Sequence, residues 1–416
     1  GGYEDRLRGE KGMGITLVDV HNRGQGKFNE GKFDTLPKTG KTLISTIDIK
    51  LQEYGEQLMQ NKIGAIVAIE PSSGEILSLI SAPTYNPNIL SGRNRSKEYK
   101  NLIENKNKPL FNRALTGQYP PASTFKLING LISLEEKVIS PMTIFSCDDG
   151  YEYEKDKKVG CHPHRQNLSL KSAIAISCNS YFCKTFAEIF KKYDNTHQAY
   201  EVWRNHLQSF GIGDWMNNDF LTGAKGKLPK QDYYNNTYGK KYWNSSTIIS
   251  TAIGQGELLL TPIQMANITC IIANRGYYYT PHIISGIENE EKIDSSFTIK
   301  KYSTISKKNF EIVIEGMEQV IASPKGTANN IFNKNITVCG KTGTAENPHG
   351  EDHSIFIAFA PKDNPKIAIA VYIENGGWGS KWAAPISSLM IEKYLNKPTN
   401  QKLEDFILNG NLVSNK

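Results

Sequence analysis

Ser123 and Lys126 are the residues whose types and spacing first suggest chemistry. They stand in Tyr119-Pro-Pro-Ala-Ser-Thr-Phe-Lys126, and apolar residues at helical spacing follow between 127 and 132. Residues three apart on a helix lie on one face, one turn from each other. A serine hydroxyl is a weak nucleophile until a base takes its proton, and burial can lower the pKa of a lysine far enough to make it that base. The pair predicts an activated serine at a helix start; the plain alternative is a surface Ser–Lys pair.

Ser177-Cys-Asn179 is a second short motif, between the apolar stretch 170–176 and a predicted helix that starts near Tyr181. A hydroxyl and an amide two residues apart can relay a proton and hold a substrate amide. The same pattern is also common in turns and helix caps. Taken alone, it therefore predicts little.

Lys341-Thr-Gly-Thr344 is a third motif, directly after a predicted apolar strand over 336–339. Gly343 would let a substrate backbone lie along the strand edge. Lys341, Thr342 and Thr344 would form a pocket for a carboxylate. Each of the three motifs is weak by itself, and a plain hairpin end is the alternative here. In this order within one chain, they predict a single serine acyl-transfer site.

A cluster of cysteine and histidine lies between the first and second motifs. Its members are Cys147, Cys161, His162, His164 and Cys178. Three thiolates and one imidazole form a closed structural Zn²⁺ site, so we predict Cys147, Cys161, His164 and Cys178 as ligands, with His162 as the alternative histidine. A Cys147–Cys161 disulfide and unlinked thiols remain alternatives. Because Cys178 stands inside the second motif, a metal would hold that motif from behind and would not take part in the reaction.

The elements that must position these motifs can be read from hydrophobic periodicity. Alternating apolar stretches over 65–69 and 75–80 predict a hairpin, and strand patterns return at 336–339, 354–360 and 366–373. The middle, from about 110 to 275, is mostly helical pattern, and Asp48 predicts the N-cap of an earlier helix. We therefore expect an α/β (α+β) fold in which helices flank one five-stranded antiparallel sheet, with strands from both ends of the chain.

Composition excludes several classes of protein. The chain has 416 residues, 38% of them hydrophobic, and a formal net charge of +7. This is enough apolar material for a sizeable core, which excludes a disordered chain, and the dispersed charge disfavours a nucleic-acid partner. No apolar stretch is long enough to span a bilayer. The chain begins Gly-Gly-Tyr without an initiator Met, so we expect a fragment of a protein with an upstream anchor.

Several longer signatures carry a family resemblance. They are Leu7-Arg-Gly9, Glu70-Pro-Ser-Ser-Gly-Glu75, Tyr119 to Lys126, Ile253-Gly-Gln-Gly-Glu257 with Thr261-Pro-Ile-Gln-Met265, and Glu374-Asn-Gly-Gly377. With the three motifs, they resemble the penicilloyl serine transferases, and among these the class B penicillin-binding proteins of the elongation type (penicillin-binding protein 2). The resemblance covers nearly the whole chain. The chain departs from the pattern at Ala122, where this type usually has glycine, and at Cys178.

The resemblance implies a serine-type peptidoglycan D,D-transpeptidase that β-lactams acylate. It makes Ser123 the nucleophile and Lys126 its base, with Ser177 and Asn179 in proton relay and substrate binding. It places Lys341, Thr342, Gly343 and Thr344 around the terminal carboxylate of a stem peptide. The backbone N–H groups of Ser123 and Thr344 would form the oxyanion hole. No cofactor is required for this chemistry.

The resemblance also implies an organisation and a location. Residues 1–40 would be the remnant of an N-terminal pedestal, and 41–416 the transpeptidase domain. The protein would face the periplasm from the inner membrane through a single N-terminal anchor missing from the given chain. Its partners would be peptidoglycan stem peptides, β-lactams, a membrane glycan polymerase and other elongation-complex proteins. A serine β-lactamase, a D,D-carboxypeptidase, a β-lactam sensor and a catalytically dead scaffold are the rival interpretations.

Overall fold

A five-stranded antiparallel sheet lies at the centre of the computed structural model, which describes residues 2–289 and 294–413. Its strand order is β11-β12-β13-β4-β5. The bounds are β4 (Gly64–Ile69), β5 (Ile76–Ala82), β11 (Cys339–Ala345), β12 (His353–Ala360) and β13 (Ile367–Ile373). Strands from both ends of the chain meet where β13 pairs with β4. The predicted fold class is confirmed.

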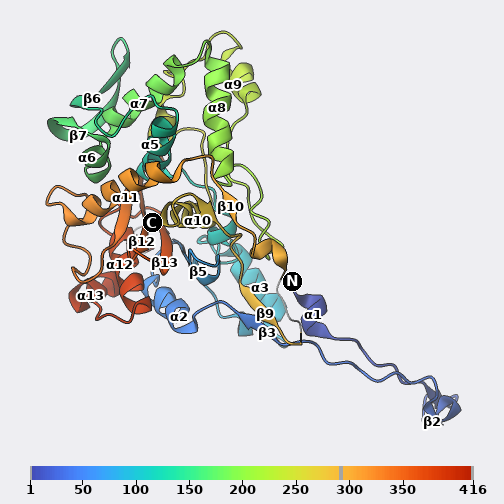
Figure 1. Ribbon diagram of the computed structural model, residues 1–416. Coiled ribbons are helices and arrows are strands. Elements are labelled where there is room, and N and C mark those ends of the chain that lie inside the picture. The colour runs from blue at the N-terminus through green and yellow to red at the C-terminus, as the bar shows by residue number, and fades with distance from the viewer. Residues whose placement is uncertain (1, 290–293, 414–416) are drawn as a thin grey trace.

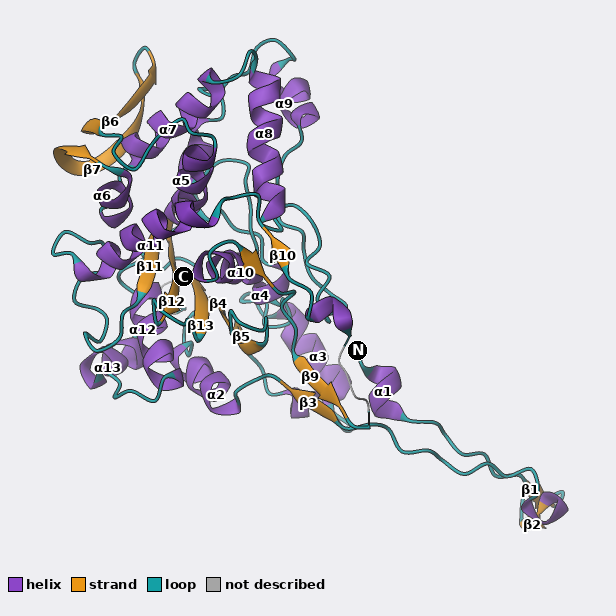
Figure 2. Cartoon of the chain, viewed as in Figure 1, coloured by secondary structure: helices purple, strands orange, loops and turns teal. Residues whose placement is uncertain are grey.

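Helices cover the sheet because its central strands are apolar on both sides. Every residue of β4 and of β13 is buried. Helices α2 (Ile49–Leu58) and α12 (Ala383–Tyr394) pack together on one side, and α10 (Pro262–Ala273) packs on β13 and β4 from the other (Figure 2). Asp48 caps α2 as predicted, since its carboxylate accepts from the backbone N–H groups of Lys50 and Leu51.

A helical region and a long hairpin stand over the β11 end of the sheet (Figure 1). Its elements are α5 (Lys126–Glu135), β6 (Phe145–Glu154), β7 (Lys157–Leu168), α6 (Leu170–Ala175), α7 (Asn179–Lys191), α8 (Thr196–Ser209), α9 (Gln231–Tyr238) and α11 (Lys307–Ala322). Helix α7 packs on α5 and on β6, and α11 packs on β11 and α6. The first and second motifs therefore begin helices of this region, while the third lies in the sheet.

The first forty residues form an arm that runs away from the rest of the molecule (Figure 1). It contains α1 (Glu4–Arg8), β1 (Thr16–Val18) and β2 (Gly24–Lys27), and none of its described residues is buried. Strand β3 (Leu43–Ser45), which follows the arm, pairs with β9 (Ile284–Ile287). The arm thus contributes little to the hydrophobic core.

The remaining helices and strands are short connecting elements. They are α3 (Arg95–Glu104), α4 (Arg113–Thr116), β8 (Tyr277–Tyr278), β10 (Lys301–Tyr302) and α13 (Gln401–Asn409), with 3-10 turns η1 (Phe28–Gly31), η2 (Pro87–Leu90), η3 (Ala122–Phe125), η4 (Ile249–Ile253) and η5 (Ser295–Phe297). Within the described part of the chain, none of the helices has the length and apolarity that crossing a bilayer requires.

Candidate active site and metal centre

Ser123 lies in η3, a tight turn that runs directly into α5. The residue before it, Ala122, is buried and has a φ of 49°, in the left-handed region that residues other than glycine rarely adopt. The backbone of Ala122 packs closely against Gly254 and forms a hydrogen bond with it. The Ala122 N–H donates to the Gly254 carbonyl at 2.8 Å, and a Cβ on Gly254 would lie 2.2 Å from the Ala122 carbonyl oxygen. The nucleophile therefore follows a constrained turn.

Lys126 is fully buried and reaches the second motif. Its Nζ lies 2.8 Å from the Ser177 carbonyl oxygen, 3.2 Å from Ser177 Oγ and 2.5 Å from Asn179 Oδ1. Burial lowers the pKa of Lys126 to about 8, against the opposing effect of nearby cysteines. Among the described residues, the Ser123 hydroxyl has no hydrogen-bond partner, and the Lys126 ammonium group bonds to the second motif. The lysine is thus placed between the first and second motifs.

The second motif lies in the turn between α6 and α7. Ser177 has a φ of 59° and is almost fully buried. Asn179 begins α7, and its Nδ2 donates to the Gly160 carbonyl oxygen of β7 at 2.7 Å. The Asn179 side chain thus joins Lys126 on one side to the β6–β7 hairpin on the other. The sequence contains no local signal for the contact with Gly160.

The third motif lies inside β11, so the prediction that it follows a strand over 336–339 was wrong. Lys341 is fully buried, and its Nζ donates to the Thr342 carbonyl oxygen at 3.0 Å. Burial, with a further contribution from Lys126, holds the pKa of Lys341 well below its ordinary value. Pairing with β12 along the full motif makes it a strand although Lys341 and Gly343 have a low intrinsic preference for strands.

Gly343 allows the first and third motifs to approach each other. A Cβ at this position would lie 3.2 Å from Thr124 Cγ2 and 3.4 Å from the Pro121 carbonyl oxygen. Gly379, in the loop between β13 and α12, also lies close to β11, since a Cβ added there would lie 2.5 Å from the Gly343 carbonyl oxygen. Gly343 is thus required for close packing between η3 and β11. The sequence analysis predicted only that it lets a substrate backbone lie along the strand edge.

Two further polar side chains contact β11. Thr327 Oγ1 lies 2.7 Å from Thr342 Oγ1, and Gln255 Nε2 donates to the Thr344 carbonyl oxygen at 3.3 Å. Gln255 belongs to the signature over 253–257, which offered a signal, whereas nothing in the sequence marks Thr327. Both residues position the strand that carries the third motif.

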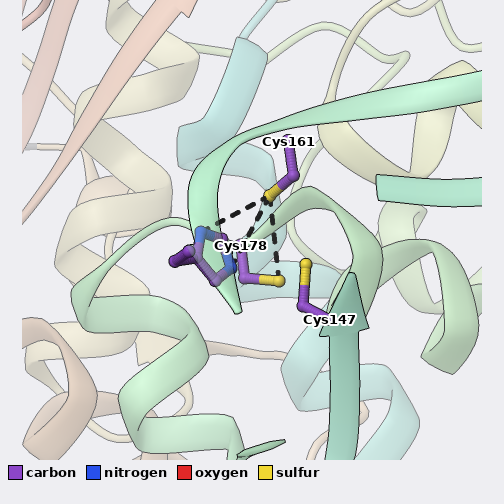
Figure 3. A group of neighbouring side chains, drawn as sticks. Cys147, Cys161 and Cys178 are labelled. Atoms are coloured by element: carbon purple, nitrogen blue, oxygen red, sulfur yellow. Dashed lines mark hydrogen bonds between the residues drawn. The ribbon is translucent and has the colours of Figure 1, made fainter. Parts of the chain in front are cut away.

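The four predicted metal ligands come together. One ligand atom from each of Cys147, Cys161, His164 and Cys178 lies within 4.8 Å of the others, and the three sulfurs turn toward one another in Figure 3. Cys161 Sγ is 3.9 Å from Cys178 Sγ and 3.8 Å from His164 Nε2. Ligand atoms of a tetrahedral zinc site with bonds of about 2.3 Å are roughly 3.7 Å apart, so this donor set fits the ion. All six cysteines are free thiols, which disfavours the disulfide alternative.

The sulfur atoms of Cys161 and Cys178 both accept hydrogen bonds from backbone N–H groups at the start of α7. The Asn179 backbone N–H donates to Cys161 Sγ at 3.2 Å. Cys178 is the N-cap of α7, and its Sγ accepts from the Tyr181 N–H at 3.4 Å. The hydrogen bond with Cys178 and those from the helix N–H groups hold the pKa of Cys161 well below its ordinary value. The cluster therefore holds a metal-ready thiolate next to Ser177 and Asn179.

The chain shows clear similarity to known proteins. Residues 64–392 match the family described as the penicillin binding protein transpeptidase domain. Peptidoglycan D,D-transpeptidase MrdA of Haemophilus influenzae is 31% identical, over 95% of this chain and 62% of the relative. MrdA of Escherichia coli K12 is 30% identical, over 91% of this chain and 61% of the relative. The chain thus spans about three fifths of the length of these relatives.

Two solved structures share the fold. Pseudomonas aeruginosa PBP2 in complex with WCK 5153 has a TM-score of 0.76 at 30% identity, covering 90% of this chain and 83% of that one. Helicobacter pylori PBP2 in its complex with MreC has a TM-score of 0.81 at 28% identity, covering 95% of this chain and 71% of that one. These similarities agree with the resemblance drawn from the motifs.

Proposed function

The chain belongs to the penicillin-binding protein transpeptidase family, as a class B member of the penicillin-binding protein 2 type, and we propose that it cross-links peptidoglycan as a serine D,D-transpeptidase. In this reaction, Ser123 attacks the penultimate D-Ala carbonyl of a stem peptide and terminal D-Ala leaves. An amine on a neighbouring stem then attacks the acyl-enzyme, which forms the cross-link and frees Ser123. β-Lactams would acylate the same hydroxyl as substrate mimics.

We assign each motif one part of the chemistry. Neutral Lys126 takes the proton of Ser123, and Ser177 passes a proton to the departing amine. Asn179 orients Lys126 and holds a substrate amide once its contact with Gly160 opens. Lys341, Thr342, Gly343 and Thr344 bind the terminal carboxylate. The backbone N–H groups of Ser123 and Thr344 stabilise the oxyanion, a contribution of about 10²–10³ in rate for each donor.

The position of Lys126 carries this proposal. Its ammonium group is buried, bonds to both functional side chains of the second motif and has a pKa lowered to about 8. A buried lysine that is neutral in part at physiological pH can act as a base, and its three polar neighbours fix its direction. A surface Ser–Lys pair would have neither the burial nor these neighbours.

Intact-mass measurement after treatment with penicillin tests the function. We expect one penicilloyl adduct on each chain, mapped to Ser123 and hydrolysed slowly, together with cross-linking of stem pentapeptides that Ser123→Ala abolishes. Rapid turnover of penicillin would instead identify a β-lactamase. Release of D-Ala without cross-linked product would identify a carboxypeptidase, and either result would contradict the transpeptidase.

We further propose that the Cys/His cluster holds a structural Zn²⁺ ion. Cys147 of β6, Cys161 and His164 of β7, and Cys178 at the start of α7 would be its ligands. A bound ion would supply a fixed tie between the hairpin and the second motif, and no reaction chemistry. The cluster residues orient that motif because Cys178 stands between Ser177 and Asn179.

Metal analysis tests the cluster directly. Protein purified without chelators should contain about one zinc per chain, and Cys147→Ser should lose it together with several degrees of thermal stability. Cys270→Ser is the matched control, because Cys270 is buried in α10 away from the cluster. Less than about half an equivalent of zinc in the wild type would contradict the site.

We also propose a domain organisation and a setting. Residues 41–416 would form the transpeptidase domain, and 1–40 would belong to a pedestal. The catalytic face would work in the periplasm, next to the inner membrane. Elongation-complex proteins and a glycan polymerase would be the partners. The complex of the Helicobacter pylori PBP2 with MreC supports the first of these. Co-purification of the full-length protein with these components is the test.

A further inference from the structure

Glu374 forms hydrogen bonds with Arg113 and Tyr119, two residues that precede Ser123 in the chain. Its Oε1 accepts from Arg113 Nε at 2.8 Å and from the Tyr119 hydroxyl at 2.8 Å. Arg113 is 4% exposed, and its Nη1 and Nη2 atoms donate to the carbonyl oxygens of Lys108 and Asn107, respectively. Glu374 directly follows β13, whereas Arg113 and Tyr119 lie on the segment that leads to Ser123. One carboxylate thus fixes this segment to the end of the sheet.

Tyr119 is held by its ring and backbone as well. Its ring stacks on Tyr372 of β13 with centroids 4.1 Å apart. Its N–H donates to the Leu260 carbonyl oxygen at 2.9 Å, and the Leu260 N–H donates back to the Tyr119 carbonyl oxygen at 2.8 Å. Four residues later the chain reaches Ser123 through the constrained Ala122.

The protonation states of Arg113, Tyr119 and Glu374, which we call the clamp, keep its hydrogen bonds formed. Burial and the adjacent Glu374 carboxylate hold the pKa of the Tyr119 hydroxyl above its ordinary value, so the group remains a donor. Arg113 stays protonated at every working pH. Hydrogen bonds to an ionised carboxylate are stronger than neutral ones, so both donors hold their positions firmly.

We propose that Tyr119 and Glu374 are positioning residues for Ser123, and this inference rests on the proposed function. Their hydrogen bond sets the direction from which the backbone enters η3, and with it the place of the Ser123 hydroxyl and N–H. A displacement of about 1 Å at a reacting group can cost about 10²-fold in rate. The clamp therefore acts on the acylation step and leaves the affinity for the ligand nearly unchanged.

Tyr119→Phe is the sharpest test, because it removes one hydroxyl and retains the ring on Tyr372. Stopped-flow acylation with a fluorescent penicillin separates the first-order acylation rate constant from the dissociation constant. We expect the rate constant to fall about tenfold and the dissociation constant to change less than about twofold. Intact mass confirms that wild-type protein is labelled at Ser123.

Tyr193→Phe is the matched control. The Tyr193 hydroxyl donates to the half-buried Glu136 carboxylate, which also binds Lys192, so a tyrosine hydroxyl, a carboxylate and a cation meet there as well. This cluster lies at the far end of α5 from Ser123. Tyr193→Phe should lower the melting temperature about as much as Tyr119→Phe but leave the acylation rate constant unchanged.

Two substitutions of Glu374 test whether an acceptor oxygen at this position preserves the acylation rate. Glu374→Gln retains an oxygen that can accept from Tyr119 and should keep a larger part of the rate than Glu374→Ala. Equal acylation rate constants for Tyr119→Phe and wild type would overturn the inference while the proposed function stands. A rate loss that only follows the melting temperature, as in Tyr193→Phe, would also overturn it. Failure of wild-type protein to be labelled at Ser123 would overturn both proposals.

Discussion

Burial of Lys126 sets the pH range in which Ser123 can be acylated. The lysine acts as a base only when neutral, and its pKa falls from the ordinary 10.5 to about 8. We therefore expect the acylation rate constant to rise about tenfold per pH unit below about pH 8 and to level off above it. A lysine with an ordinary pKa would let the rate rise further, to above about pH 10.

The pH–rate profile of penicillin acylation between about pH 6 and about pH 10 measures this limit. Lys126→Arg, which stays charged throughout, should lose most of the rate and show no such rise. A wild-type rate that is independent of pH over this range would contradict Lys126 as the base.

Ala122 is a residue in strain, and its replacement should stabilise the protein. A non-glycine residue with a φ of 49° costs about 1–2 kcal/mol. Ala122→Gly removes this cost, whereas the greater freedom of glycine in the unfolded chain takes back about 0.4–1 kcal/mol. We expect a net gain of about 0.5–1 kcal/mol in the free energy of unfolding, measured by denaturant titration.

A matched control for Ala122 lies in a regular helix. Ala266 is equally buried, in α10, so Ala266→Gly should destabilise the protein by about 1 kcal/mol. Loss of stability in both variants would show that the left-handed backbone at Ala122 carries no strain.

At the scale of elements, the contact of η3 with β11 forms the site, and Gly343 permits it. In Gly343→Ala, the new methyl group would lie 3.2 Å from Thr124 Cγ2 and 3.4 Å from a backbone oxygen. We expect η3 to move outward and the acylation rate constant to fall about 10–10²-fold. The melting temperature should fall only slightly, because one loop can adjust.

Gly286→Ala in β9 is the control for this contact. Its methyl group would also meet a neighbour at 3.2 Å, the Cδ1 of Ile44, far along the chain from the three motifs. Acylation should not change in this variant. If both alanine variants acylate at the wild-type rate, close approach at Gly343 does not matter for the chemistry.

Local sequence patterns predicted the elements well and their contacts poorly. The hairpin β4–β5, the helix after Ser123 and the Cys/His cluster follow from periodicity and residue type, which are local properties. The Tyr119–Glu374 bond joins residues 255 apart, so only tertiary packing can reveal it. The strand character of Lys341 likewise comes from its pairing with β12, against local preference.

At the scale of the whole molecule, both terminal segments pack on the domain, but to different extents. The arm over 1–40 contacts it through few groups, such as the Tyr3 hydroxyl, which donates to Asp219. Near the other end, α13 buries Ile407, and the carbonyl oxygens of Ile407 and of Gly410, which follows the helix, accept from the buried Lys62 Nζ at 2.7 Å and 3.2 Å. With the proposed domain boundary near residue 41, we therefore expect a small effect from removal of the arm and a large one from removal of α13.

Deletion of residues 1–40 should leave the domain folded and active. Because no described residue of the arm is buried, we expect the free energy of unfolding to change by no more than about 1 kcal/mol and penicillin acylation by less than about twofold. Deletion of the chain from residue 400 onward should instead cost about 3 kcal/mol or more, since it exposes apolar surface and leaves the buried Lys62 without acceptors from α13. Denaturant titration and acylation of the two truncated proteins measure both effects. If loss of the arm destabilises the protein as much as loss of α13 does, residues 1–40 belong to the transpeptidase domain and the proposed boundary is wrong.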